Sequence, residues 1–477
     1  MATLSEFDAI VIGAGPTGCV AAKLLARWGH RVALLSRRAP PVNVAESLPP
    51  SAATILQLAG AEAAVHHSAF SRCHGNVAWW GAGEPRRETY PEDSAGYHIR
   101  RAQFDDRLRG DVAELLFDAP VKEVRRVASE FEVRTADRTY RAPFLLDCSG
   151  RAGVVARDYR IRNDAQRTIG VAAIWTQGQA FPVETTYTLI EAYPDGWAWG
   201  IPLSLTEIYA GAILDSQQTD RLTGSGLDAM LAAEINKTHA FRELLRNAEP
   251  VEVASCGAST YDSRSYSDDG LFLVGDAAST VDPISSFGLK KGLTSAWLAA
   301  VCVHTSLIDS SRRHPAHQHY DVQTRQSHAD LERNAGRHFA VIADRQPHPF
   351  WTVRAAQGKA FYDQSSLLNE LARLRALPSI SLERASCVRP GRRIRVSGNE
   401  IVWEEACVTD ALPAGLEFAC GVDLMLLARL ADNSDQVASL HLLYNQAAEP
   451  VDLPNFLGAL CLLLSSGVLR HRASEKG

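Results

Sequence analysis

The chain has 477 residues, enough to bury a large hydrophobic core and to form two or three domains. Hydrophobic residues make up 46% and charged residues 22% of it, a composition typical of a soluble globular protein. Its formal net charge of -6 gives no reason to expect binding to nucleic acid.

The nine cysteines are an odd number, scattered along the chain without a C-x-x-C pair. This pattern argues against a disulfide framework or a zinc site and favours a reducing compartment, so we expect no metal. The first residues lack the basic segment and cleavage site of a signal peptide. The longest apolar stretch near the C-terminus, residues 456–469, is too short and too rich in small polar residues to span a bilayer. We therefore expect a cytoplasmic protein without membrane contact.

Residues 7–36 predict a β-strand, a tight turn, a helix and a second strand. Gly13, Gly15 and Gly18 follow the first strand with the G-x-G-x-x-G spacing. In such a unit the first glycine permits the turn, the second lets the backbone approach a pyrophosphate, and the third lets helix and strand pack closely. The helix N-terminus then holds the phosphates. This unit predicts a dinucleotide site, for NAD(P) or for FAD, rather than a purely structural glycine turn.

Further along the chain, a loop leads to Glu46-Ser47, and a strand end turns into a helix near Arg101. Alternating strands from about residue 170 to 255 indicate an antiparallel sheet that forms one wall of a pocket. A buried strand then ends in Gly275-Asp276, and helical stretches follow at about 288–309 and 316–343. A boundary near residues 377–378 or 389–393 precedes a C-terminal region whose apolar periodicity suggests a small helical or winged-helix domain.

Gly275-Asp276 helps to decide between the two dinucleotides. Asp276 lies between a buried strand and a helix start, where a short carboxylate can accept a hydrogen bond from a sugar hydroxyl. The following helix N-terminus can stabilise negative charge on a reduced flavin. An ordinary N-cap aspartate is the alternative interpretation.

Together, these motifs resemble the family of FAD-dependent aromatic hydroxylases, flavin-dependent halogenases and geranylgeranyl reductases over about residues 7–310. The resemblance implies FAD as the cofactor, O₂ as co-substrate, and NAD(P)H or another reductant as a transient electron donor. It implies an α/β fold with a Rossmann-like, GR2-type FAD-binding domain at residues 1–75, 98–170 and 256–310. The other predicted parts are an inserted antiparallel β-sheet substrate domain (76–97 and 171–255), a helical segment (311–385) and a small winged-helix-like C-terminal domain (386–477).

The resemblance also assigns residues to the cofactor. Arg101 matches the arginine that the family places near the pyrophosphate, and residues 283–289 would contact the flavin ring. Residues 147–150 resemble a strand end beside the flavin phosphates. Ser36 stands where family members usually have a glutamate for the ribose, so we expect weaker FAD binding. The complete predicted set is Gly13, Gly15, Pro16, Thr17, Gly18, Ser36, Arg37, Ser47, Arg101, Gly275, Asp276, Pro283, Ser286, Gly288 and Leu289.

Residues 197–202 match the W-x-W-x-I-P signature of flavin-dependent halogenases and predict a substrate pocket at Trp197, Trp199 and Pro202. Two core tryptophans on one strand face are the alternative. Yet halogenases use a lysine between the Glu-Ser motif and the flavin arginine, and no lysine occurs between Lys23 and Lys122. Tryptophan halogenases also place a glutamate in the segment that matches 283–286, which contains Ser285 here. These departures weigh against halogenation.

The remaining pattern resembles the flavoproteins of tryptophylquinone cofactor biogenesis, of the quinohemoprotein amine dehydrogenase maturation type. We therefore predict an FAD-dependent monooxygenase that hydroxylates a tryptophan of a precursor polypeptide through a flavin C4a-hydroperoxide. A halogenase, a small-aromatic hydroxylase, a double-bond reductase and a non-catalytic escort of an immature partner remain alternatives. His74, Glu46 and Asp195 are candidate catalytic acids and bases by position alone. The C-terminal domain would recognise the peptide, or serve in packing or dimerisation.

Overall fold

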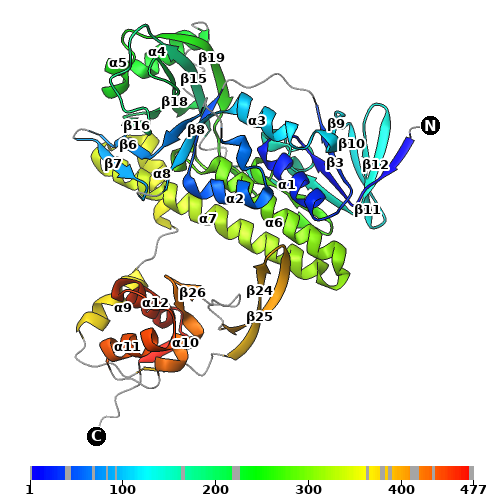
Figure 1. Ribbon diagram of the computed structural model, residues 1–477. Helices are drawn as coiled ribbons and strands as arrows, with labels where there is room; N and C mark the ends of the chain where they lie inside the picture. The colour runs from blue at the N-terminus through cyan, green and yellow to red at the C-terminus, as the bar shows by residue number, and fades with distance from the viewer. Residues whose placement is uncertain are drawn as a thin grey trace. The chain divides into compact units, whose positions relative to one another are not determined.

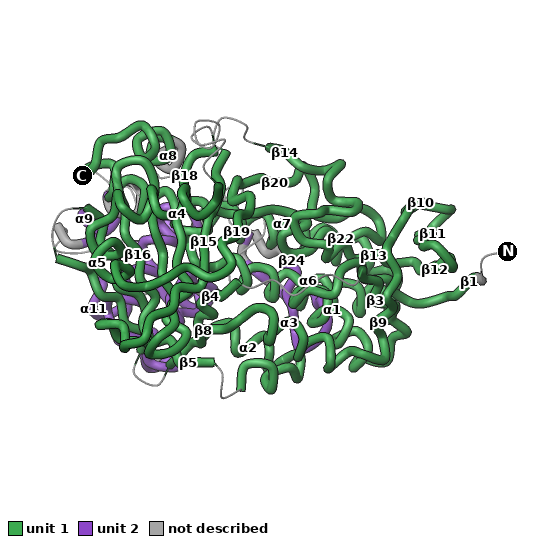
Figure 2. The backbone as a smooth tube through the Cα atoms, turned by 90° about the horizontal axis from the view of Figure 1, so that it is seen from above, with its two compact units in different colours: residues 1–361 green, residues 362–477 purple. Residues whose placement is uncertain are grey.

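The computed structural model describes residues 3–37, 44–66, 70–81, 84–91, 94–162, 167–216, 226–360, 365–376, 382–384, 389–408, 418–431 and 436–471. The chain divides into two compact units, residues 1–361 and 362–477, and each is described by itself (Figures 1 and 2). The division falls inside the predicted helical segment 311–385. The predicted boundary at 385/386 lies outside the described residues.

The first unit contains a six-stranded sheet in the order β21-β22-β13-β2-β3-β9. Its strands are β2 (Ala9–Ile12), β3 (Val32–Ser36), β9 (Leu116–Asp118), β13 (Phe144–Asp147), β21 (Ser267–Asp268) and β22 (Leu271–Leu273). All neighbours pair in parallel except β21 and β22. β2, β13 and β22 are buried along their whole length, as central parallel strands are.

The strand, turn, helix and strand predicted for residues 7–36 are present. Helix α1 (Pro16–Arg27) joins β2 to β3 and begins at Pro16, whose fixed φ suits the first helical position. Gly29, with φ of 88°, takes the left-handed conformation that lets the chain leave the helix. One side of α1 packs against α6 (Gly288–Ile308), a long and largely buried helix.

A seven-stranded sheet in the order β19-β15-β18-β17-β16-β6-β7 completes the main framework of this unit. Its strands are β6 (Gly75–Trp79), β7 (Arg86–Thr89), β15 (Thr168–Thr176), β16 (Tyr187–Tyr193), β17 (Gly196–Pro202), β18 (Glu207–Asp215) and β19 (Glu249–Gly257). The sheet is mixed rather than antiparallel as predicted, because β6 pairs in parallel with β16. One face packs against α4 (Gly226–Asn236) and α5 (Ala240–Leu244), and the other against α7 (Arg313–Arg345) and α8 (Pro349–Ala360).

Helix α7 connects the two sheets (Figure 1). Near its N-terminus, the Tyr320 hydroxyl donates a hydrogen bond to the Leu273 carbonyl at 2.7 Å, and His317 stacks on Phe272 of β22. Near its C-terminus, Phe339 lies in the cluster that covers the seven-stranded sheet. Helix α7 therefore packs against both sheets.

Smaller elements fill the rest of the unit. A four-stranded sheet consists of β1 (Thr3–Glu6), β12 (Arg138–Ala142), β11 (Glu130–Arg134) and β10 (Glu123–Val127). A three-stranded sheet consists of β4 (Ala45–Leu48), β8 (Gly96–Arg100) and β5 (Ser71–Cys73), and β14 (Arg160–Arg162) pairs with β20 (Tyr261–Ser263). Helices α2 (Pro50–Ala59) and α3 (Arg101–Gly110) follow β4 and β8.

The second unit has its own apolar core, which includes Leu427, Leu440, Tyr444, Phe456 and Leu460. Its helices are α9 (Ser365–Ala376), α10 (Leu424–Leu430), α11 (Val437–Ala447) and α12 (Leu453–Ser465). Its strands are β23 (Leu382–Arg384), β24 (Arg389–Ser397), β25 (Glu400–Val408), β26 (Phe418–Ala419), β27 (Val422–Asp423) and β28 (Leu469–His471), and β24 with β25 forms a hairpin. The winged-helix assignment stays a prediction.

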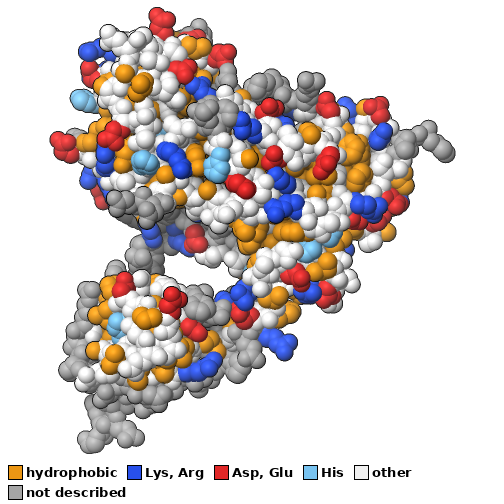
Figure 3. All heavy atoms as spheres, viewed as in Figure 1, with side chains coloured by type: hydrophobic (Ala, Val, Ile, Leu, Met, Phe, Trp, Pro, Cys, Tyr) orange, Lys and Arg blue, Asp and Glu red, His pale blue; other side chains and the backbone are white. Residues whose placement is uncertain are grey.

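On the face of the first unit seen in Figure 3, acidic and basic side chains are interspersed. No helix within the described part of the chain combines the length and the apolar character that crossing a membrane requires.

Candidate functional site

The first unit holds a groove of about 660 Å³, called here the large groove. It runs past the turn between β2 and α1, the end of β3 at Ser36 and Arg37, the segment after β13, and the start of α6. The carboxyl ends of the parallel strands thus open into it, which is where open α/β sheets bind their ligands.

Each glycine of the first turn has a different physical task. Gly13 has φ of 104°, and a Cβ there would lie 2.5 Å from the Cys148 carbonyl oxygen. A Cβ on Gly18 would lie 1.8 Å from the Gly13 carbonyl oxygen, so only glycine lets helix and strand approach this closely. A Cβ on Gly15 would meet nothing within 4 Å, because this residue faces the open groove.

The N-terminus of α1 is suited to an anion. Gly15 is the N-cap residue, so no side chain accepts a hydrogen bond from the first N–H groups, and the first turn contains no acidic residue. Free N–H groups and the positive end of the helix dipole therefore point at the groove beside Gly15. A pyrophosphate fits this position by charge and by space, as the glycine motif predicts.

The opposite wall is held by Asp147, a fully buried residue at the end of β13. Its carboxylate accepts hydrogen bonds from the Ser149 N–H at 3.0 Å, the Ser149 hydroxyl, and the N–H groups of Val155 and Ala156 at 2.7 and 2.8 Å. These bonds fix the segment Cys148–Gly150, which lines the groove.

Arg101 lies in the groove wall, at the start of α3, between two carboxylates. Its guanidinium contacts Glu46 of β4 and donates to Asp105 at 2.9 Å. Burial lowers the pKa of Arg101, but the two carboxylates outweigh it and hold the pKa above its usual range. Arg101 therefore keeps its charge and orients Glu46, which lines both the large groove and the chamber described below.

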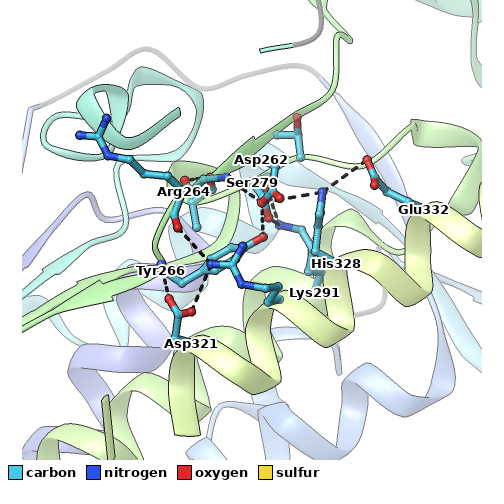
Figure 4. A network of polar contacts seen from close by, with 12 residues as sticks. Asp262, Arg264, Tyr266, Ser279, Lys291, Asp321, His328 and Glu332 are labelled. Atoms are coloured by element: carbon cyan, nitrogen blue, oxygen red, sulfur yellow. Dashed lines mark hydrogen bonds and ion pairs between the residues drawn. The ribbon is translucent and has the colours of Figure 1, made fainter. Parts of the chain in front are cut away.

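Asp276 follows β22, and the segment that carries it is held by Lys291 of α6, which Figure 4 shows beside Ser279. The Lys291 ammonium group donates hydrogen bonds to the Ser279 carbonyl and, at 3.3 Å, to the Gly275 carbonyl and the Ser279 hydroxyl. Burial lowers the pKa of Lys291, and the charges of Asp276 and Asp262 oppose this shift. Asp262 in turn accepts a hydrogen bond from the Tyr266 hydroxyl. The lysine thereby ties α6 to the segment that carries Asp276.

A second cavity of about 290 Å³, called here the aromatic chamber, adjoins the groove. The two share Glu46, Asp276, Gly288 and Leu289. Trp197 and Trp199 of β17 and Tyr209 of β18 form much of its apolar wall; the Trp197 and Trp199 ring centroids are 5.8 Å apart. Both tryptophans point to one face of the sheet, as expected for positions two apart. A planar, electron-rich molecule suits such walls.

Asp282 also lines the chamber and is absent from the predicted site set. Its carboxylate accepts a hydrogen bond from the Ile284 N–H at 3.0 Å. Burial raises its pKa, and the Ile284 N–H and Arg354 offset part of the shift. The sequence shows Asp282 directly before Pro283, but not that it is buried beside a cavity and within electrostatic reach of Arg354, which lies in the distant helix α8.

Most predicted site residues line one of these two cavities. Those in the large groove are Gly13, Gly15, Pro16, Thr17, Ser36, Arg37, Arg101, Asp276, Gly288 and Leu289. Ser47, Pro283, Ser286, Trp197 and Trp199 line the aromatic chamber. Gly18 and Gly275 line neither; they permit close packing, with Gly275 at φ of 64° beside Thr17.

Three predicted residues lie away from the cavities. His74 is exposed, and its backbone joins Thr186 and Tyr90 at the edge of β6. Asp195 lies in the turn between β16 and β17, where its carboxylate pairs with Lys237 at 2.7 Å. Pro202 is buried and its carbonyl lies 3.2 Å from His98 Nδ1. His74, Asp195 and Pro202 thus lie outside both cavities, whereas Glu46 lines both, and the catalytic and pocket roles assigned to these residues stay predictions.

Comparison with known proteins shows which family this chain resembles in sequence. Residues 6–307 match the model of the FAD-binding-domain family. The chain is 30% identical over 327 residues to a tryptophan 2-halogenase of Chondromyces crocatus, an alignment that covers 63% of this chain and 61% of that halogenase. It thus spans less than two thirds of that relative.

Two solved structures share the fold. A flavin-dependent halogenase, CmlS, superposes with a TM-score of 0.81 at 20% identity and covers 99% of this chain and 97% of its own. A peptidyl tryptophan dihydroxylase essential for tryptophylquinone cofactor biogenesis, QhpG, superposes with a TM-score of 0.66 at 23% identity, covering 97% and 100%. The predicted kinship with tryptophylquinone flavoproteins therefore rests on fold alone, whereas the curated sequence relative is a halogenase.

The glycine turn, the uncapped helix N-terminus and the match over residues 6–307 agree on the dinucleotide. The chain belongs to the FAD-binding-domain family, and FAD is its cofactor.

Proposed function

We propose that this protein oxidises an electron-rich aromatic ring, an indole or a phenol, with reduced FAD and O₂. The observation that carries the proposal is the aromatic chamber, whose Trp197, Trp199 and Tyr209 walls open to the large groove through four shared residues. When bound and reduced, FAD supplies the electrons for O₂ activation. NAD(P)H or another reductant would supply a new pair of electrons to the oxidised FAD.

The chain's own residues exclude water and manage protons. Trp197 and Trp199 give the chamber apolar walls, which favour a planar ring and disfavour water. Arg101 holds the Glu46 carboxylate at the junction of the two cavities. Asp282, with its raised pKa, keeps a proton to higher pH than an exposed aspartate and is the best placed proton donor in the chamber.

Halogenation is the first candidate outcome, because the curated relative is a tryptophan 2-halogenase. This gives halogenation more weight than the motifs alone do. Hydroxylation is the second candidate, favoured by one observation: no lysine lines either cavity among the described residues, and none occurs between Lys23 and Lys122. The indole ring could also belong to a tryptophan within a polypeptide, and the fold shared with QhpG supports this form of the substrate.

Product analysis tests the proposal. FAD-loaded protein is supplied with a reductant, ¹⁸O₂, chloride or bromide, and one of indole, phenol or a tryptophan-containing peptide, and products are analysed by mass spectrometry. A halogen isotope pattern identifies a halogenase, and ¹⁸O in the ring identifies a hydroxylase. Reoxidation of FAD without any ring product would overturn the proposal.

A matched pair of variants ties the activity to the chamber. Ile213→Trp adds bulk to the chamber wall, beside the residues predicted to contact the flavin ring, and is expected to abolish ring oxidation and to weaken FAD binding. Leu205→Trp makes a comparable change at a position that is 64% exposed, and is expected to keep full activity.

A further inference from the structure

A third cavity, called here the outer pocket, borders the aromatic chamber. It has a volume of about 170 Å³ and shares Ser47, Ile190, Ser285 and Ser286 with the chamber. Its other walls come from β6, from Glu88 and Tyr90 at the end of β7, and from Asn334 and His338 of α7. None of these wall residues belongs to the predicted site set.

The size of the outer pocket suits one aromatic ring. A cavity of about 150 Å³ is enough to hold benzene. Trp80 supplies an aromatic surface. Its side chain is 7% exposed, and the centroid of its ring lies 5.4 Å from the centroid of the His338 ring. Ala78, Ile190 and Ile284 add apolar surface.

Four polar side chains of the wall are available to bind a ligand. Within the described part of the chain, the side chains of Asn76, Tyr90, Asn334 and His338 form no hydrogen bond to another residue, and their polar atoms are not sealed off. Burial lowers the pKa of His338, so its ring stays neutral with one nitrogen able to donate and one able to accept. Burial also raises the pKa of Tyr90 to about 12, so its hydroxyl keeps its proton.

The aromatic chamber is too small to hold the flavin ring and the whole substrate ring at the same time. Pro283, Ser286, Gly288 and Leu289, predicted to contact the flavin ring, all line it, and so do Trp197 and Trp199, predicted to bind the substrate. A three-ring isoalloxazine against residues 283–289 takes up chamber volume. The substrate ring then needs another place within reach, and the outer pocket is separated from the chamber by residues that line both cavities.

We infer that the outer pocket binds the substrate ring, and that it selects a single aromatic ring bearing a hydrogen-bond donor, such as a phenol O–H or an indole N–H. Trp80 and His338 lie against the ring, and Asn334, Asn76 and Tyr90 hydrogen-bond its polar substituent. Ser47, Ser285 and Ser286 mark the opening toward the chamber. This inference rests on the proposed function and adds where the substrate lies and what distinguishes it.

The experiment compares phenol with toluene, which has nearly the same shape but no O–H, on the FAD-loaded protein. Binding is measured by isothermal titration calorimetry, and FAD content by absorbance. Asn334→Leu and His338→Phe keep side-chain bulk and remove hydrogen-bonding groups. Each is expected to weaken phenol binding about tenfold while toluene binding and FAD content stay unchanged. Ala78→Phe fills the pocket and is expected to abolish binding of both ligands.

Gln323→Leu is the matched control, since it makes a similar polar-to-apolar change on the exposed side of α7. Unchanged phenol affinity in all three pocket variants, or a crystal structure with phenol in the aromatic chamber, would overturn the inference. If ring oxidation continues in those variants with phenol affinity unchanged, the inference fails and the proposed function stands. If the FAD-loaded protein neither binds nor oxidises any ring, both fail.

Discussion

At the scale of a single residue, we predict that Ser36 sets the affinity for FAD. It ends β3 in the large groove, and its hydroxyl donates to the Arg37 carbonyl at 3.3 Å. A carboxylate here would accept charge-assisted hydrogen bonds from ribose, each contributing about 1.5–3 kcal/mol. Ser36→Glu is therefore expected to tighten FAD binding by about tenfold or more, measured by fluorescence titration of the apoprotein. Gln323→Glu adds the same charge on α7 and should change nothing; equal affinity of Ser36→Glu and the natural chain would contradict the ribose assignment.

In the βαβ element, Gly18 is expected to matter for stability and Gly15 for FAD binding. Gly18→Ala forces a Cβ to within 1.8 Å of the Gly13 carbonyl oxygen, so α1 must move away from β2. We expect Gly18→Ala to destabilise the protein by about 2–4 kcal/mol, because the added Cβ overpacks the contact between α1 and β2. The variant should also fail to bind FAD, because α1 moves away from its place beside the groove. The Cβ that Gly15→Ala adds meets no other atom within 4 Å, so the melting temperature of the apoprotein is expected to stay nearly unchanged. The same Cβ stands where the backbone must approach the pyrophosphate, so FAD binding is expected to weaken strongly.

Differential scanning calorimetry and FAD titration distinguish these two outcomes. Gly110→Ala is the control, since a Cβ there also meets nothing within 4 Å and the residue lies outside the groove. If Gly15→Ala retained FAD as tightly as Gly110→Ala, the pyrophosphate would not lie beside Gly15.

Across the whole molecule, buried neutral histidines make stability depend on pH. Burial lowers the pKa of both His98 and His317 to about 4, from 6.5 when unfolded. Between these values the unfolded chain binds more protons, so stability is highest above pH 6.5 and falls as pH drops toward 4. Each histidine is expected to lower the free energy of unfolding by about 2 kcal/mol as the pH falls from 7 to 5. Urea unfolding at the two pH values measures the loss, and His98→Gln should reduce it, whereas His66→Gln, on the surface, should not.

The local part of this fold was predictable from the sequence, and the long-range part was not. The glycine spacing and its flanking strands predict the βαβ unit because the approach of Gly18 to Gly13 and the hydrogen bond from Gly13 to Leu35 join residues close in the chain. The close approach of Gly13 to Cys148 is long-range and is not indicated by the spacing. The pairing of β6 with β16 joins segments more than a hundred residues apart, and nothing within residues 75–79 indicates it.

The same distinction explains the site. Residues in motifs, such as Arg101 and Asp276, line the large groove together with the glycine turn. His74 and Asp195 were chosen by position in the chain, which does not reveal that one faces outward and the other pairs with Lys237. Asn334 and His338 reach the outer pocket from a helix that begins beside a different sheet, so no sequence pattern could connect them with Trp80.

The carboxylate of Asp147 has a consequence for how the holoprotein assembles. Because its four hydrogen bonds all go to the chain itself, the wall at Cys148–Gly150 owes its shape to the polypeptide and not to a ligand. A wall that is already in place leaves little ordering entropy to be lost during reconstitution. Mixing apoprotein with FAD should then give a single fast phase whose rate rises linearly with FAD concentration, without the plateau that a slow rearrangement would impose.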